Sequence, residues 1–336
     1  MKRIAINGFG RIGRLFFRQA VLDPEIEIAA VNDLGDLENL VYLLKFDSVY
    51  GLFNKEVKIS GMTLSVDNKE IKFFQIKNPA ELPWKDLNID IVVESTGAFE
   101  SYEAARQHIL AGAKKVVLTA PAKDADTPDA KTVLVGVNED DFQTTTLTSN
   151  GSCTTNAASP VIAVLAQNPG IEKAILNTVH AYTATQGLVD GISKGSDWRR
   201  GRAAADNIVP STTGAALAVA RAFPALAGKF DGISLRVPVL IGSIADITFV
   251  SKRPTTAEEI NQIMMDAAAM PQWQGVLAAT SEPIVSSDIV GSPYAAIVDL
   301  TFTKVVDGNL VKVLSWYDNE WGYASVLLKH VKKIRV

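Results

Sequence analysis

Short apolar runs alternate with helical patterns over the first part of the chain. The runs, each of which reads as a buried strand, are residues 3–7, 26–31, 89–94, 115–118 and 133–135. Between them, apolar residues recur with a helical period over residues 14–22, 34–44 and 101–111. Alternation of strand and helix is typical of a parallel sheet covered by helices on both faces. The pattern therefore predicts a doubly wound α/β domain.

Residues 45–77 interrupt this alternation with shorter runs that are separated by turns. The runs 55–59, 63–66 and 71–75 have strand character, and Asp67 with Asn68 forms a typical hairpin turn. We therefore expect an antiparallel insertion within the first domain.

The second half of the chain carries longer apolar runs with few helices between them. The strand-like runs are residues 171–179, 232–239, 244–252, 295–304 and 310–316, and helical patterns cover residues 211–223 and 257–269. This spacing predicts an α+β domain with a mixed, mainly antiparallel sheet. A chain of 336 residues exceeds what one hydrophobic core usually supports, so two domains are expected.

Composition limits the classes of function. The net charge is −4, the pI is near 5.5, and the lysines and arginines are scattered, which argues against nucleic acid or a membrane surface as the main partner. No apolar run is long enough to cross a membrane, and the short strand after Met1 does not fit a secretory signal, so a cytoplasmic protein is expected. The single cysteine excludes an intrachain disulfide, and no metal site is predicted.

The first predicted strand runs into a glycine-rich turn, residues 8–13, that opens the first helix. Strand, glycine turn and helix, with Asp33 about 20 residues beyond, match the dinucleotide-binding fingerprint. Gly8 and Gly10 let the backbone approach a pyrophosphate at the helix N-terminus. The Asp33 carboxylate accepts hydrogen bonds from ribose hydroxyls and repels a 2′-phosphate, so NAD is favoured over NADP. The alternative is that Asp33 caps the helix at 34–44.

Four further residues lie at or near predicted strand ends or in loops, where a doubly wound sheet binds its ligand. They are Lys77, Thr96, Gly97 and Thr119. We expect them to contact the dinucleotide, although each is equally compatible with a turn that binds no ligand.

The only cysteine, Cys153, follows turn-forming residues and precedes an apolar helical pattern. Ser152 fits the N-cap position, which places Cys153 in the first turn of a buried helix. A helix N-terminus together with a basic neighbour lowers the pKa of a thiol, so a reactive thiolate is expected. The alternative is a small buried hydrophobe. Against it, Thr154, Thr155 and Asn156 are costly to bury without a polar contact.

His180 follows the predicted strand 171–179, whereas the other two histidines fall in predicted amphipathic helices. A thiol at a helix start and an imidazole at a strand end are able to meet in space as a Cys/His nucleophile pair. A hydrogen-bonded structural histidine is the alternative.

Donors suited to a phosphate gather in the second half of the chain. They are Thr183, Arg199, Arg200, Thr212, Thr213 and Arg236. Arg236 interrupts the apolar run 232–239, where an unpaired charge is expensive. The stretch 191–202, which also holds Lys194, has little periodicity, and we interpret it as a long functional loop. Arg199 and Arg200 are alternatively surface residues without a ligand.

Four motifs together resemble phosphorylating NAD-dependent glyceraldehyde-3-phosphate dehydrogenase over the whole chain. They are the glycine turn with its flanks (6–14), the cysteine segment (152–156), the histidine segment (180–183) and residues 316–323. The resemblance implies an NAD-binding Rossmann domain over residues 1–152, a catalytic domain over 153–318 and a C-terminal helix, 319–336, that packs back on the NAD domain. It also implies a homotetramer.

The resemblance assigns the nucleophile to Cys153 and the base to His180. With the glycines and strand-end residues above, the predicted NAD contacts are Gly8, Gly10, Arg11, Ile12, Asp33, Lys77, Thr96, Gly97, Thr119, Asn319 and Tyr323. The residues implied to hold substrate and inorganic phosphate are Ser152, Thr154, Thr183, Arg199 or Arg200, Thr213, Gly214 and Arg236.

The implied reaction is oxidation of D-glyceraldehyde 3-phosphate to 1,3-bisphosphoglycerate with NAD and inorganic phosphate, through a thiohemiacetal and a thioester on Cys153. Three alternatives stay open. The first is an erythrose-4-phosphate dehydrogenase, and the second is an NAD-binding thiol redox sensor. The third is a Cys/His hydrolase, against which the dinucleotide motif speaks.

The chain departs from the family pattern in two places. Gly151 stands where the pattern has alanine, and we expect a looser turn before Cys153. The loop 191–200 is one residue longer than the family form, which leaves open whether Arg199 or Arg200 is the phosphate ligand.

Overall fold

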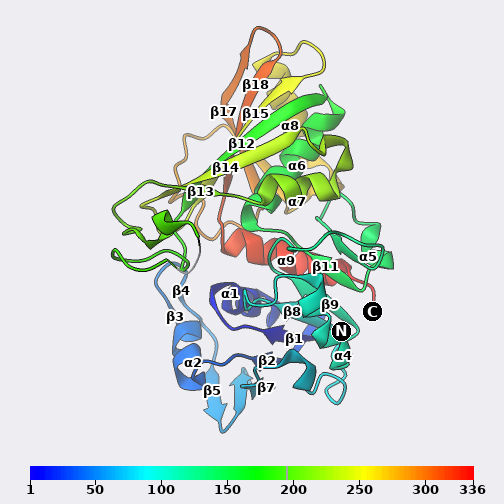
Figure 1. The fold of residues 1–336 in the computed structure, drawn as a ribbon, viewed down its shortest axis with the longest axis vertical. Coiled ribbons are helices and arrows are strands. Elements are labelled where there is room, and N and C mark those ends of the chain that lie inside the picture. Colours follow the sequence, from blue (N-terminus) through cyan, green and yellow to red (C-terminus); the bar gives the residue numbers. More distant parts are fainter. Residues whose placement is uncertain (194–195) are drawn as a thin grey trace. The chain divides into compact units, whose positions relative to one another are not determined.

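The computed structural model describes residues 1–193 and 196–336. Lys194, which belongs to the predicted functional loop 191–202, lies outside the described residues. The chain forms two compact units (Figure 1): unit 1 consists of residues 1–151 and 327–336, and unit 2 of residues 152–326. The second division falls inside the last helix, α9 (Trp321–Lys333), which therefore belongs to both units. Within the described ranges, no helix is long and apolar enough to span a membrane.

The described residues of unit 1 form a nine-stranded sheet in the order β10-β11-β9-β8-β1-β2-β7-β6-β5. Its strands are β1 (Lys2–Asn7), β2 (Ile26–Asn32), β5 (Val57–Ser60), β6 (Thr63–Val66), β7 (Lys69–Phe74), β8 (Ile91–Glu94), β9 (Lys115–Leu118), β10 (Ala130–Thr132) and β11 (Leu147–Ser149). Every pair from β10 to β7 is parallel, and β7-β6 and β6-β5 are antiparallel. The doubly wound sheet and its antiparallel insertion are confirmed, and the insertion extends the same sheet.

Short helices connect these strands. They are α1 (Arg11–Ala20), α2 (Leu37–Lys45), α3 (Tyr102–Ala105), α4 (Gln107–Leu110) and α5 (Asp141–Thr144). The helix predicted over 101–111 is thus two short helices that meet at Arg106. Two short strands, β3 (Phe46–Asp47) and β4 (Gly51–Leu52), form a separate pair.

The strand predicted at 133–135 is wrong, because residues 130–132 and 147–149 form the edge of the sheet instead. The Asn138 side chain accepts a hydrogen bond from Leu134 N (2.9 Å) and donates one to Thr132 O (2.9 Å). These side-chain bonds compete with a strand ladder and turn the backbone away from it.

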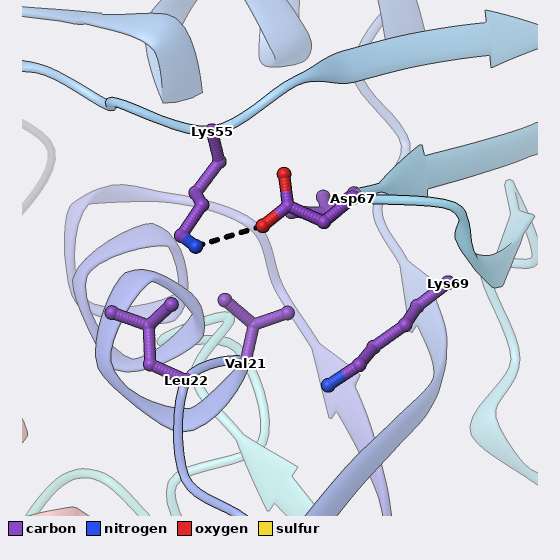
Figure 2. Close-up of a pocket in the computed structure, with 6 residues that line it drawn as sticks. Val21, Leu22, Lys55, Asp67 and Lys69 are labelled. Atoms are coloured by element: carbon purple, nitrogen blue, oxygen red, sulfur yellow. Dashed lines mark ion pairs between the residues drawn. The ribbon is translucent and has the colours of Figure 1, made fainter.

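The insertion packs beside the end of α1. Figure 2 shows Lys55 reaching Asp67 there, and their ion pair spans 2.8 Å. Asp67 and Asn68 have φ values of 48° and 66°, which confirms the predicted hairpin turn. The small cavity between these elements, about 170 Å³, has Val21 and Leu22 on its apolar side. None of the described residues that line this cavity is a predicted site residue. We therefore interpret it as a gap left where the insertion packs on the end of α1.

The described residues of unit 2 form a seven-stranded sheet in the order β13-β14-β12-β15-β18-β17-β16. The strands are β12 (Ile171–Ala181), β13 (Val209–Thr212), β14 (Phe230–Val237), β15 (Ser243–Ser251), β16 (Leu277–Thr280), β17 (Ala296–Val306) and β18 (Leu310–Tyr317). Only β12-β14 and β16-β17 are parallel pairs among them. The mixed, mainly antiparallel sheet is confirmed.

Helices α6 (Cys153–Gln167), α7 (Ala215–Ala222) and α8 (Ala257–Ala269) pack on this sheet (Figure 1). Alternate residues of β15 are buried, as expected for a strand with one helix-covered face. The helix predicted from residue 211 begins at Ala215, because residues 209–212 pair with β14 as β13. Neither β13 nor β16 is predicted from the sequence.

The last helix starts at Trp321 and not at Asn319. The Asp318 carboxylate accepts hydrogen bonds from Glu320 N (2.9 Å) and Trp321 N (2.8 Å). Asp318 therefore satisfies backbone donors at the helix start, which is the function of an N-terminal cap.

Candidate active site

Cys153 is the first residue of α6, where the sequence predicts it. Ser152 is the N-cap: its Oγ accepts a hydrogen bond from Thr155 N (3.0 Å), and Thr155 Oγ1 accepts one from Ser152 N (3.0 Å). This reciprocal capping box fixes the backbone at the helix start. The thiol consequently lies at the positive end of a long buried helix.

The imidazole of His180 lies next to that thiol. Cys153 Sγ is 3.3 Å from His180 Nε2, and His180 is 3% exposed. Although the sequence places His180 after its strand, β12 continues to Ala181 and includes it. The predicted meeting of a helix-start thiol and a strand-end imidazole is confirmed.

Arg236 stands beside His180 because the two residues are partners in the β12-β14 register. Its Nη1 lies 2.6 Å from His180 Nδ1 and 3.2 Å from Ala181 O, and that carbonyl oxygen is 2.6 Å from the same ring nitrogen. The Ala181 carbonyl only accepts and favours a proton on Nδ1, whereas the Arg236 N–H only donates and favours a proton on Nε2. In the tautomer with the proton on Nδ1, the lone pair of Nε2 faces the thiol. Burial and the charge of Arg236 lower the pKa of His180 to about 3. The ring is therefore uncharged at neutral pH and able to accept a proton.

The expected lowering of the Cys153 pKa is wrong. Burial raises the pKa of the thiol, and this effect outweighs the lowering by the Arg236 charge and by hydrogen bonds from Thr154 and from the backbone. Position at a helix N-terminus alone does not ionise a desolvated thiol. Ionisation of Cys153 therefore depends on transfer of its proton to a neighbouring base.

Tyr317 joins the helix start to the sheet, and sequence reasoning missed it. Its buried hydroxyl lies 2.9 Å from Thr154 Oγ1 and 2.7 Å from Thr178 Oγ1, and its ring packs edge-on against His180 at 5.9 Å. Burial raises the pKa of Tyr317, so the phenol stays protonated. One sequence signal could have identified Tyr317: it lies at the end of an apolar strand and within the family motif 316–323.

The two candidate arginines of the loop differ in their contacts. Arg199 is bound to Asp197, with Nε 2.7 Å from Oδ1, and its side chain is 59% exposed. Arg200 donates to Ser211 Oγ from Nη2 (2.7 Å). Burial is the main cause that lowers the pKa of Arg236, and the charge of Arg200 lowers it further. Arg200 is therefore the one of the two that acts electrostatically on Arg236.

The other predicted anion ligands lie near the ends of β12 and β13 and at the start of α7. Thr183 Oγ1 is 2.9 Å from Thr185 Oγ1, and Thr213 Oγ1 accepts a hydrogen bond from Ala215 N (3.2 Å). Gly214 is the N-cap residue of α7 and has no heavy atom within 4 Å of the place where a Cβ would stand. Thr212 lies at the end of β13.

Unit 1 holds a second cavity, of about 380 Å³, at the carboxyl ends of β1, β2 and β8. The predicted residues that line it are Gly8, Gly10, Asp33, Lys77 and Thr96. This is the edge at which a doubly wound sheet binds a dinucleotide. The described residues that line the cavity do not include Arg11, Ile12, Gly97 or Thr119.

Those four residues have other surroundings. Arg11 forms an ion pair with Asp47 (2.7 Å), Ile12 belongs to the first turn of α1, and Gly97 has a φ of 68°. Thr119 donates from Oγ1 to Glu94 O (3.0 Å). Arg11 and Ile12 directly follow the lining residue Gly10 in the chain, and Gly97 lies between the lining residues Thr96 and Ala98.

Asp33 does not cap a helix, so that alternative is wrong. Asp36 is the N-cap of α2, and its side chain accepts a hydrogen bond from Asn39 N. Asp33 instead accepts bonds from Phe9 N (2.6 Å) and Gly35 N (2.7 Å). The carboxylate is thus tied to the glycine turn while it lines the cavity.

Two of the predicted NAD contacts, Asn319 and Tyr323, lie in unit 2. Asn319 Oδ1 accepts hydrogen bonds from Gly242 N (3.1 Å) and Ser243 Oγ (3.0 Å). Because a backbone N–H only donates, this contact identifies the oxygen of the amide and fixes the direction of its NH₂ group. Tyr323 lies in α9 and is buried.

Gly10 and Gly13 differ in a way that tests the fit of a dinucleotide. A Cβ at Gly13 would lie 2.1 Å from Gly8 O, whereas a Cβ at Gly10 would meet no heavy atom within 4 Å. Gly13 is thus required by the fold. Gly10 keeps free the space through which a pyrophosphate reaches the start of α1, so the residues present fit a dinucleotide.

We therefore expect Gly10→Ala to fold normally and to bind NAD about tenfold or more weakly, because the added methyl group occupies the approach of the pyrophosphate. Gly13→Ala, the matched control, is expected to lose about 3 kcal/mol of stability through overpacking. Calorimetric titration with NAD and thermal unfolding measure the two effects. Unchanged NAD affinity of Gly10→Ala would refute this placement of the cofactor.

Gly151, expected to loosen the turn before Cys153, has a φ of 62°. This left-handed conformation costs a residue with a side chain about 1 kcal/mol, and glycine adopts it freely. Gly151 therefore relieves strain in the turn. Its N–H also donates to Ser149 Oγ (3.1 Å), which holds the turn in place.

Comparison with known sequences identifies the family to which this chain belongs. The family models described as "Glyceraldehyde 3-phosphate dehydrogenase, NAD binding domain" and "Glyceraldehyde 3-phosphate dehydrogenase, C-terminal domain" match residues 2–102 and 152–319. "Glyceraldehyde-3-phosphate dehydrogenase 2" of Streptomyces avermitilis is 49% identical over 97% of this chain and 96% of its own length. "Glyceraldehyde-3-phosphate dehydrogenase" of Thermotoga maritima is 49% identical over the same shares. The protein of Bacillus subtilis with the name "Glyceraldehyde-3-phosphate dehydrogenase 2" is 45% identical over 98% of this chain and 96% of its own. This chain, with its cysteine–histidine pair and its NAD-binding domain, therefore belongs to the glyceraldehyde-3-phosphate dehydrogenase family.

Proposed function

We propose that the chain oxidises D-glyceraldehyde 3-phosphate to 1,3-bisphosphoglycerate with NAD and inorganic phosphate. The observation that carries the proposal is the 3.3 Å approach of Cys153 Sγ to His180 Nε2 at the start of α6, in a chain that also has an NAD-binding domain. This pair has the geometry of an activated thiol nucleophile. The polar groups around it suit a phosphorylated aldehyde.

In the proposed reaction, His180 takes the thiol proton as Cys153 Sγ attacks the aldehyde carbon. It returns this proton to the former carbonyl oxygen, which gives the hydroxyl of the thiohemiacetal. His180 next accepts the proton of the thiohemiacetal hydroxyl. NAD, when bound, supplies the hydride acceptor. The carbon is then a thioester carbonyl, and a phosphate oxygen attacks it, which breaks the C–S bond and returns Cys153 as a thiolate.

Cys153 N–H, at the start of α6, is suited to stabilise the tetrahedral oxyanion, because helix N-terminal amides lack intrahelical acceptors. A thioester conserves the energy of aldehyde oxidation until phosphate arrives. The chain's own contribution is therefore to hold the acyl group and to move its protons.

The proposed ligands of substrate and inorganic phosphate are Ser152, Thr154, Thr183, Arg200, Thr213, Gly214 and Arg236, with Arg199 as the alternative to Arg200. Arg200 is preferred because its charge acts on Arg236, whereas Arg199 is bound to Asp197. The proposed NAD contacts are Gly8, Gly10, Arg11, Ile12, Asp33, Lys77, Thr96, Gly97, Thr119, Asn319 and Tyr323. Asp33, a carboxylate at the cavity wall, supports preference for NAD over NADP.

The choice between the two arginines leads to a direct prediction. Arg200→Leu is expected to raise the KM for inorganic phosphate or aldehyde about tenfold or more, since a charge-assisted bond to an anion is worth about 1.5–3 kcal/mol. Arg199→Leu, the matched control, should leave both KM values within about twofold, since exposed ion pairs contribute little. Initial-rate kinetics with each substrate varied measure this. The reverse order of effects would assign the ligand to Arg199.

NADH formation, followed by its absorbance, tests the proposed reaction. Rates are measured with glyceraldehyde 3-phosphate in the presence and absence of phosphate or arsenate, and with erythrose 4-phosphate as the comparison substrate. Strict dependence on the anion and preference for the three-carbon aldehyde support the proposal. Preference for erythrose 4-phosphate would favour the related dehydrogenase, and absence of turnover would favour a thiol redox sensor.

The tetramer, the location and the domain division are parts of the same proposal. Several apolar side chains within residues 186–193 and 196–208 are exposed, including Leu188 (73%), Ile192 (102%) and Trp198 (83%), which is typical of a surface that another chain covers. A mass of four chains of 36.1 kDa in analytical ultracentrifugation is expected. The mechanism needs a reduced thiol, which the cytoplasm maintains. We retain residues 1–152 as the NAD domain, 153–318 as the catalytic domain and 319–336 as a helix that returns to the NAD domain.

A further inference from the structure

A buried carboxylate, Glu94, stands at the carboxyl end of β8. It is 3% exposed, and both of its oxygens accept hydrogen bonds. Oε2 accepts from Asn7 Nδ2 (2.6 Å) and lies 2.9 Å from His108 Nε2. Oε1 accepts from Thr96 N (2.8 Å) and from the Thr96 hydroxyl. A carboxylate in such a place is tolerated because donors surround it.

The contact between His108 and Glu94 is a hydrogen bond from a neutral ring and not an ion pair. Trp84 Nε1 donates to His108 Nδ1 at 3.0 Å. Because an indole N–H only donates, Nδ1 carries no proton, and the single ring proton lies on Nε2, where it is donated to Glu94. His108 and Trp84 are both 0% exposed. The Glu94 charge is thus held by directed hydrogen bonds, each of which requires its donor in place.

These bonds continue to the walls of the 380 Å³ cavity. Asn7 Oδ1 accepts from Asn32 Nδ2 (2.6 Å), and Asn32 binds both backbone groups of Ile76, accepting from its N–H (2.9 Å) and donating to its C=O (3.0 Å). On the other side, Thr96 Oγ1 accepts from Ala98 N (3.0 Å). Asn7, Asn32, Ile76, Thr96 and Ala98 all line the cavity.

The network therefore joins three walls that come from different parts of the sequence. One wall is the end of β1, one is the end of β2 with the Ile76 segment, and one is the loop after β8. Glu94 and His108 stand behind these walls and do not line the cavity that the described residues form. A change at either residue reaches a ligand only through the wall residues.

We propose that Glu94 and His108 are positioning residues of the dinucleotide site. Glu94 sets the distance between the Thr96 loop and the β1 end, and His108, fixed in one tautomer by Trp84, keeps the carboxylate in place. The proposal rests on the placement of NAD in this cavity. It assigns a role in cofactor affinity to two buried groups that take no part in the chemistry at Cys153.

Glu94→Gln keeps the size of the side chain and replaces one acceptor oxygen by an NH₂ donor. Depending on the orientation of the amide, the NH₂ group faces either Asn7 and His108 or the two donors of Thr96. In both orientations one wall of the cavity loses its hydrogen bonds to residue 94. We expect the NAD dissociation constant and the KM for NAD to rise about tenfold or more, as for loss of a buried charged acceptor. The kcat at saturating NAD and the KM for the aldehyde should stay within about twofold.

A pair of variants at His108 tests the same bonds. His108→Gln offers an oxygen to Trp84 and an NH₂ group to Glu94, so NAD affinity within about threefold of wild type is expected. His108→Leu removes both the acceptor for Trp84 and the donor to Glu94. It should weaken NAD binding as much as Glu94→Gln does. If Glu94→Gln does not fold, the contrast between these two variants carries the test. Equal NAD affinity of folded His108→Gln and His108→Leu would overturn the proposal.

Asp126→Asn is the matched control. The Asp126 carboxylate accepts hydrogen bonds from Thr132 N (2.9 Å), Thr132 Oγ1 (3.2 Å) and the Tyr102 hydroxyl (3.1 Å) in the same unit, but none of these residues lines the cavity as described. Asp126→Asn should lower the melting temperature of the protein and leave its NAD affinity unchanged. Folded Glu94→Gln with wild-type NAD affinity contradicts the positioning role, as does a loss that Asp126→Asn reproduces. If Gly10→Ala also binds NAD normally, the placement of the cofactor is wrong. If Gly10→Ala binds weakly, only the positioning role fails.

Discussion

Cys153→Ser should fold, bind NAD with wild-type affinity and lose at least about 10³-fold in kcat, the scale seen when a catalytic nucleophile is removed. Serine keeps the shape of the side chain at the first position of α6, where the Ser152 cap and not the thiol organises the backbone. Its hydroxyl is far less acidic than a thiol, and one uncharged imidazole does not ionise it.

The same residue predicts the stoichiometry of inactivation. Because Cys153 is the only thiol of the chain, one equivalent of iodoacetamide should abolish turnover and modify a single peptide. Thermal unfolding and NAD titration of Cys153→Ser serve as controls for its integrity. Turnover of this variant above a small fraction of the wild-type rate would rule out a covalent mechanism.

His180→Asn is expected to lower kcat by about 10²–10⁴-fold, the range for loss of a general base. The ring is 3.3 Å from Sγ, and burial and Arg236 hold its pKa at about 3. The resting ring is therefore uncharged from neutral pH down to strongly acidic pH, and we expect it to act on the thiol as the acceptor of its proton. Alkylation of Cys153 by iodoacetamide should consequently slow in the variant as well.

The pH dependence follows from the same two pKa values. Since the His180 pKa lies far below neutrality and burial raises the pKa of the thiol, the wild-type alkylation rate should still be rising at mildly alkaline pH. His330→Gln is the control, because His330 is also buried with a pKa of about 3 but belongs to unit 1, bonded to Thr148. It should lose stability and keep its kcat per folded molecule. A kcat of His180→Asn within tenfold of wild type would exclude His180 as the base.

Local sequence signals identified most of the elements that carry the site. The glycine turn, the apolar runs and the Ser152 cap are encoded by neighbouring residues, and the elements around Cys153, Gly10 and Asp33 follow from them. The prediction of a strand at 133–135 was wrong because the Asn138 side chain forms hydrogen bonds with the backbone of this apolar run and of the residue before it. The missed strand β13 is only four residues long and is defined by its partner, β14.

The rest of the site depends on pairing between distant segments. The register that places Arg236 beside His180 has no local signal, and neither has the contact of Tyr317 with Thr154 and Thr178. The thiol pKa was predicted in the wrong direction because burial, which depends on tertiary packing, outweighs the helix terminus and Arg236. Glu94 and His108 read as ordinary strand and helix residues until their hydrogen bonds are known.

The central claim is that the acyl group of the substrate is carried by Cys153 until phosphate removes it. The most direct measurement is rapid mixing of the protein with NAD and glyceraldehyde 3-phosphate without phosphate, followed by acid quenching and peptide mass spectrometry. The account predicts a burst of one NADH per active chain and a phosphoglyceryl adduct on the Cys153 peptide that disappears when phosphate is added. Steady NADH formation without phosphate, or a burst with no adduct on that peptide, would contradict it.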